Sequence, residues 1–127
     1  MRYTTLLLAV TMLACFGSRS GDRALQDPEV LTQDDIRASS ARNAYELVER
    51  LRPRWLRPGP DRSLRLDTVI LVYFDGVRLG GVDTLRDIER ESILTMRVLD
   101  ASRAGHLPGL GSQHVERVIL VSSRTAP

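Results

Sequence analysis

The feature that most constrains the fold is the stretch Val69–Phe74, which is apolar at every position and is followed at once by Asp75-Gly76. Its β-branched and aromatic composition predicts a short strand that is buried on both faces of a sheet. Asp-Gly is a strong signal for a two-residue type I′ hairpin, because that turn needs positive φ at both central positions. We therefore predict that the chain turns at Asp75 and Gly76 and returns as a strand over Val77–Leu79.

Two helices are predicted before this hairpin. Thr32 with Asp35 three residues later resembles a capping box and predicts the start of a first helix. Apolar residues at helical spacing predict a second helix over residues 40–52, with Glu46 and Arg50 placed for an ion pair and Pro53 ending it. Its expected apolar face consists of Ala41, Ala44, Tyr45, Val48 and Leu51.

The remaining elements complete an alternation of strands and helices. We expect short strands over residues 63–66, 93–99 and 118–121, a helix over residues 83–88 capped by Asp83, and one helical turn over residues 100–104. A Gly-rich loop, Gly105–Gln113, precedes the last strand. The predicted fold class is α+β, a small mixed sheet with two or three short helices.

Composition limits the function more than it defines it. A chain of 127 residues with 43% hydrophobic and 27% charged residues is long enough for one folded domain. A formal net charge of +2 gives no large field, so nucleic acid is not an expected partner. All 18 basic residues are Arg. The cluster Arg50, Arg52, Arg54, Arg57, Arg62 and Arg65 fits either a solvated face or contact with anionic lipid head groups or lipopolysaccharide.

The N-terminus has the pattern of an export signal. Arg2 precedes an apolar stretch, Leu6–Ala14, that is too short to span a bilayer. It ends in Met12-Leu13-Ala14-Cys15, which is similar to the lipobox of bacterial lipoproteins. That resemblance implies a signal peptide over residues 1–14 and lipid attachment, including palmitate-like acyl chains, at Cys15. The alternative is an ordinary secretory signal that is cut a few residues later and discards Cys15.

Both interpretations place the mature chain outside the cytoplasm, in the periplasm or on the outer membrane. Cys15 is the only cysteine, so no disulfide framework is expected. Residues 15–29 are mostly small and polar and predict a flexible tether. The folded domain is expected over residues 30–124.

Three segments resemble the plug domain of TonB-dependent outer-membrane receptors. Residues 72–77 read VYFDGV, residues 95–99 read TMRVL, and residues 118–124 read VILVSSR after a loop that contains Gly109 and Gly111. The glycine pair that the family carries before its last strand is replaced by Glu116 and Arg117. The resemblance covers about residues 30–124 and implies a plug-like fold without the receptor barrel, since the sequence ends at Pro127.

The resemblance implies a non-enzymatic binding protein of the cell envelope, tethered by a lipid, with an outer-membrane protein as a possible partner class. No catalytic, cofactor-binding or metal-binding residue is predicted, because the familiar motifs are missing. The Gly105–Ser112 loop lacks the Lys of a P-loop, and His106 and His114 have no Cys or carboxylate pair to complete a metal site. One alternative is a small envelope hydrolase or ligand-binding protein that uses the Gly105–His114 loop. Another is a structural relic of a receptor, which is stable but has no partner.

Overall fold

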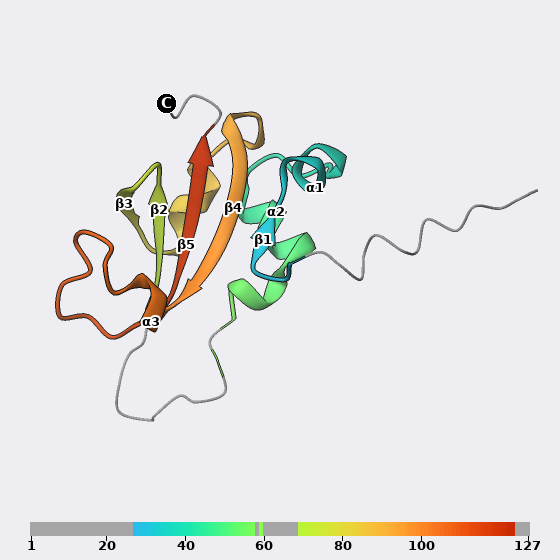
Figure 1. Cartoon of the computed structure of the whole chain (residues 1–127). Helices are drawn as coiled ribbons and strands as arrows, with labels where there is room; N and C mark the ends of the chain where they lie inside the picture. Colours follow the sequence, from blue (N-terminus) through green and yellow to red (C-terminus); the bar gives the residue numbers. More distant parts are fainter. Residues whose placement is uncertain (1–26, 58, 60–68, 124–127) are drawn as a thin grey trace, which may run out of the picture.

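The computed structural model describes residues 27–57, 59 and 69–123, which form one mixed sheet with helices on both faces (Figure 1). The strand order is β1-β4-β5-β2-β3. β2 and β5 are parallel, and the other neighbours are antiparallel. The strands are β1 (Val30–Leu31), β2 (Val69–Phe74), β3 (Val77–Gly80), β4 (Ile93–Asp100) and β5 (Val115–Ser123). The α+β class expected from the sequence is confirmed.

Most of the helical segments cover one face of this sheet, and a single helical turn lies on the other (Figure 1). The first face carries α1 (Gln33–Ala38), α2 (Ala44–Leu51) and the 3-10 helices η2 (Pro53–Trp55) and η3 (Val82–Asp87). A further 3-10 turn, η4 (Arg90–Ser92), leads into β4. The second face carries α3 (Ala101–Ala104) and the loop that follows it.

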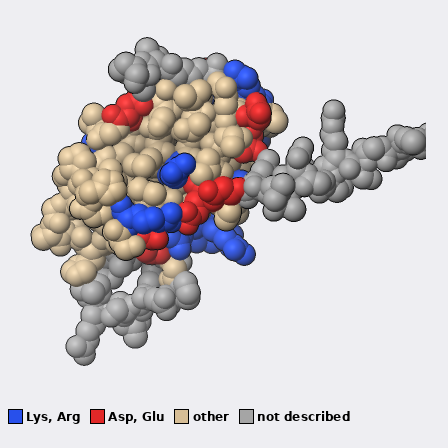
Figure 2. All heavy atoms as spheres, viewed as in Figure 1, with Lys and Arg blue, Asp and Glu red and all other residues tan. Residues whose placement is uncertain are grey.

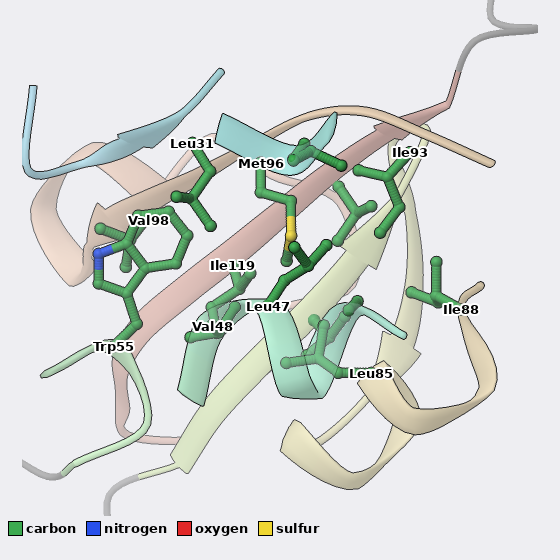
Figure 3. Packing of buried hydrophobic residues seen from close by; sticks show 14 of the residues in the cluster. Leu31, Leu47, Val48, Trp55, Leu85, Ile88, Ile93, Met96, Val98 and Ile119 are labelled. Atoms are coloured by element: carbon green, nitrogen blue, oxygen red, sulfur yellow. The ribbon is translucent and has the colours of Figure 1, made fainter. Parts of the chain in front are cut away.

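The main hydrophobic core lies between α2 and the sheet (Figure 3). Leu47 and Val48 from α2 pack against Met96 of β4 and Ile119 of β5, and all four are fully buried. Burying a side chain of this size contributes about 1.5–3 kcal/mol. Trp55 closes one end of the core, and its indole N–H donates to the carbonyl oxygen of Pro28 at 3.0 Å.

A smaller cluster lies on the opposite face of the sheet. Leu71, Tyr73 and Val118 are buried there beneath Ala104 of α3. The hydroxyl of Tyr73 donates to the carbonyl oxygen of Pro108 at 2.6 Å. β2 is therefore covered on both faces of the sheet, which agrees with its apolar sequence.

The hairpin between β2 and β3 turns at Asp75 and Gly76. Their φ angles are 47° and 81°, the left-handed conformation that a type I′ turn requires. The carboxylate of Asp75 accepts a hydrogen bond from the backbone N–H of Ser123 at 2.7 Å. Asp75 therefore has a second role, because it joins the turn to the end of β5.

Three helix boundaries differ from the predictions. α2 begins at Ala44 rather than near residue 40, because the side chain of Asn43 accepts the Glu46 N–H and caps the helix. Asp83 was expected as a cap but lies inside η3, which follows Gly81 and has no side-chain cap. That segment is a 3-10 helix ending at Asp87. The capping box of α1, Thr32 with Asp35, is present as expected.

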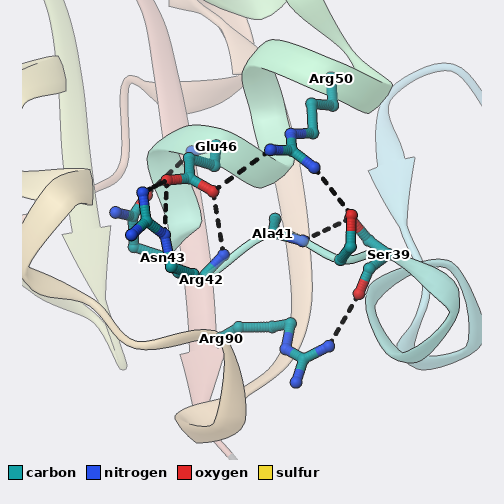
Figure 4. A network of polar contacts seen from close by, with 8 residues as sticks. Ser39, Ala41, Arg42, Asn43, Glu46, Arg50 and Arg90 are labelled. Carbon is teal, nitrogen blue, oxygen red and sulfur yellow. Dashed lines mark hydrogen bonds and ion pairs between the residues drawn. The ribbon is translucent and has the colours of Figure 1, made fainter.

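A polar network holds the connection between α1 and α2 (Figure 4). Glu46 binds Arg42 at 3.1 Å and Arg50 at 3.7 Å, both at helical i,i+4 spacing. Arg90, from the start of η4, donates to the carbonyl oxygen of Ser39 at 2.7 Å. The predicted pairing of Glu46 with Arg50 is confirmed, and a single carboxylate serves two guanidinium groups.

Candidate binding sites

The first candidate site is the outer edge of β3. In the described part of the chain β3 forms one end of the sheet and pairs with β2 alone. Val77 is 64% exposed and Leu79 is 44% exposed, although both are large apolar residues. Val77 lies opposite Phe74, so these side chains share the face of the sheet that carries the helices.

A shallow depression of about 400 Å³ adjoins this edge, and its apolar wall is formed by Phe74, Leu79 and Ile88. Three exposed carboxylates, Asp83, Asp87 and Glu89, lie on or just after η3, and two of them line the depression. None of these three carboxylates makes an ion pair with any residue that the structure describes. The site therefore combines an open strand, apolar side chains and unpaired negative charge.

The second candidate site is a cleft of about 890 Å³ beside α1, α2 and η2. One part of its wall is apolar and includes Pro28, Leu51, Pro53 and Trp55. The polar part is mostly basic and consists of Arg50, Arg52, Arg54, Asp35 and Ser39. The three arginines occupy alternate positions in the sequence, from the end of α2 into η2.

The three arginines of the cleft are held differently. Arg50 donates to the hydroxyl of Ser40 at 2.8 Å besides its contact with Glu46. Arg52 donates to backbone carbonyl oxygens, those of Leu51 at 3.0 Å and Val30 at 3.2 Å, and its buried Nε has no hydrogen-bond partner among the residues that the structure describes. Arg54 is exposed, and its guanidinium makes no ion pair with any described carboxylate.

A cluster of three charged residues, Glu29, Asp100 and Arg103, connects the start of the described domain to α3. Arg103 binds Glu29 at 2.7 Å and Asp100 at 3.2 Å. Hydrogen bonds from the Ser102 hydroxyl and then from the Arg103 backbone N–H lower the pKa of Asp100 to about 2. The hydrogen bond from Arg103 lowers the pKa of Glu29 as well. These acidic groups are therefore engaged in helix capping and ion pairing within the domain.

The Gly105–His114 loop, the alternative site predicted from the sequence, folds back on the sheet. Leu107 and Leu110 pack on the smaller cluster, and Arg78 donates to the carbonyl oxygen of Gly109 and to the Gln113 side chain. His106 and His114 are exposed. No group of three metal-binding side chains occurs among the described residues.

The residues singled out from the sequence are only partly within the structure. Cys15 lies outside the described residues, as do Arg62, Arg65 and the predicted strand over residues 63–66. Asp75 and Gly76 form the hairpin turn. Among the described helices, none has the length and apolar character needed to cross a membrane. Comparison with protein-family models, curated proteins and solved structures finds no match to this chain.

Proposed function

We propose that this chain is a non-enzymatic binding protein of the cell envelope with a plug-like fold, and that it recognises an extended segment of a partner protein. The observation that carries the proposal is the edge of β3, which pairs with β2 alone among the described strands and presents two exposed apolar side chains, Val77 and Leu79. An extended peptide can add to such an edge as a further strand, with main-chain hydrogen bonds supplying much of the affinity.

The surroundings of β3 define the chemistry of the partner segment. Alternate side chains of an added strand point to the same face, so one set would meet Val77, Leu79 and the depression next to them. Asp83, Asp87 and Glu89, which make no ion pair with any described residue, favour basic residues near that set. The expected partner segment is extended, with apolar and basic residues in alternation.

A peptide titration followed by NMR tests this proposal. The ¹⁵N-labelled full chain is titrated with a decapeptide of alternating lysine and valine, and separately with its glutamate–valine counterpart. We expect amide shift changes centred on β3 with the basic peptide only. Leu79→Ser should weaken this binding about tenfold, because it removes most of an apolar contact worth about 1.5–3 kcal/mol when fully buried.

Leu94→Ser is the matched control, because Leu94 is also a large exposed apolar residue but lies on β4 rather than at the β3 edge. Equal weakening by both substitutions, or shift changes spread evenly over the sheet, would reject the edge as the binding site. A peptide-independent doubling of mass that Leu79→Ser abolishes would show instead that a second copy of the chain occupies the edge.

The cellular location in this proposal depends on the leader. Attachment of a lipid at Cys15 would hold the domain at the outer membrane, facing the periplasm. Mass spectrometry of the protein purified from its native membranes is the test, with an acylated chain beginning at Cys15 as the expected result. An unmodified chain that begins after Cys15 would show that the protein is secreted and not anchored by a lipid.

The competing hypothesis, a hydrolase or ligand-binding protein that uses the Gly105–His114 loop, makes a different prediction. Replacing His106 and His114 together should leave peptide binding at β3 unchanged if the edge is the functional site, because both histidines are exposed. Loss of a ligand-dependent activity with unchanged folding would favour the loop instead.

A further inference from the structure

The cleft beside α2 carries more positive charge than its own residues neutralise. Three arginines line it against one carboxylate, Asp35, which is already engaged in the capping box of α1. Glu46 offsets part of the charge of Arg50 from outside the cleft. Arg52 and Arg54 have no carboxylate partner among the described residues.

Arg52 is unusual because its charge is partly buried and has no carboxylate partner in the described part of the chain. Its two terminal nitrogens donate to the carbonyl oxygens of Leu51 and Val30, and its buried Nε has no partner within that part. A guanidinium in partly desolvated surroundings loses solvation that an opposite charge nearby would replace. The two backbone contacts also fix its orientation, so an incoming anion would meet an ordered donor group.

We infer that this cleft binds a phosphate group. Guanidinium groups match the geometry of phosphate oxygens, and several of them together suit a group with more than one acceptor oxygen and up to two negative charges. The apolar wall of Pro28, Pro53 and Trp55 leaves room for the organic part of a phosphate ester. This site is separate from the β3 edge and does not depend on peptide binding there.

The phosphate could belong to a soluble compound or to a lipid head group. Pro28, in the wall of the cleft, is 13 positions after Cys15, so the intervening chain spans at most about 45 Å. If Cys15 carries the proposed lipid, the cleft remains within that distance of the membrane surface. The membrane alternative therefore depends on the proposed location, whereas soluble phosphate binding does not.

Trp55 supplies a reporter for the experiment, because it is the only tryptophan, is 4% exposed and lines the cleft. The full chain is titrated at low salt with inorganic phosphate, with phosphatidylglycerol vesicles and with phosphatidylcholine vesicles, while Trp55 fluorescence is followed. We expect a saturable change with phosphate, with the anionic vesicles or with both. Arg54→Gln should weaken it about tenfold or more, since a hydrogen bond to a charged group contributes about 1.5–3 kcal/mol.

Arg97→Gln is the matched control, with the same loss of charge. Arg97 is exposed between the core residues Met96 and Val98 of β4, so it points away from the face that carries the cleft. A response to inorganic phosphate identifies a soluble ligand, and a response confined to phosphatidylglycerol identifies a lipid surface. The inference is overturned if neither probe gives a saturable change, or if Arg97→Gln weakens binding as much as Arg54→Gln. Either result would leave peptide binding at β3 unaffected.

Discussion

The two glycines that flank β3 provide a direct measurement of how much the hairpin turn depends on left-handed backbone. Gly76 has φ 81° and Gly81 has φ −88°, and a Cβ added at either position meets nothing within 4 Å. Alanine at Gly76 must therefore bear conformational strain but no steric clash. Alanine at Gly81 bears neither, so the two substitutions form a matched pair.

The expected magnitudes follow from two opposing effects. A left-handed conformation costs an L-residue about 1–2 kcal/mol. Either substitution also reduces the conformational entropy of the unfolded chain, which stabilises the folded protein by about 0.4–1 kcal/mol. We expect Gly76→Ala to lower the free energy of unfolding by roughly 0.5–1 kcal/mol and Gly81→Ala to raise it by about 0.4–1 kcal/mol.

Urea unfolding followed by circular dichroism measures the difference. The unfolded-state contribution is common to both variants, so the gap between them, about 1–2 kcal/mol, reports the strain at Gly76 alone. With a denaturant slope of about 2 kcal/mol/M, the two midpoints should lie roughly 0.5–1 M apart. Two variants that unfold at the same urea concentration would refute a left-handed turn at Gly76.

Three further predictions test the core, the loop anchor and the acid response. Ile70→Asp should abolish folding, because it places an unpaired carboxylate in the main core, and loss of the far-ultraviolet circular dichroism signal would show it. Tyr73→Phe should cost about 1 kcal/mol by removing the hydrogen bond to the loop, whereas Tyr45→Phe removes a hydroxyl that has no hydrogen bond to any described residue and should cost less; equal costs in thermal melts would argue against the loop anchor. The pKa of Asp100 is lowered when folded, so its stabilising contribution is complete above its ordinary value of 3.8 and is lost as the pH falls through about 2. Asp100→Asn should lack this acid-dependent part, and parallel pH–stability profiles of variant and parent would contradict the assignment.

The elements that could be predicted are those whose signals are local in the sequence. Val69–Phe74 is recognisable as a buried strand from composition alone, and the structure gives the same bounds. Thr32 and Asp35 predict the cap of α1 because the motif spans only four residues. Asn43 illustrates the limit of such signals, since a helix-like apolar pattern begins two residues earlier at Ala41.

The arrangement of the strands could not be obtained from local signals. β1 pairs with β4, and β2 pairs in parallel with β5, across large separations in the chain. The cleft could not be predicted from local signals either, because Pro28, Asp35 and Arg54 come together only when α1 and α2 pack on the sheet. The sequence shows Arg54 only as one member of a basic cluster, and nothing in it distinguishes Arg54 from Arg62 or Arg65.

The two edges of the sheet differ in a way that supports the choice of β3 as a binding surface. β1 has two residues, and the carbonyl oxygen of Val30 accepts a hydrogen bond from Arg52, a side chain outside the sheet. A short edge strand, and an edge that other parts of the protein cover, are common ways of preventing unwanted strand pairing. β3 is twice as long and presents Val77 and Leu79 to solvent, with no comparable contact along its outer side among the described residues. Since an open apolar edge favours aggregation, the β3 edge is the part of the described sheet at which we propose that a partner segment adds.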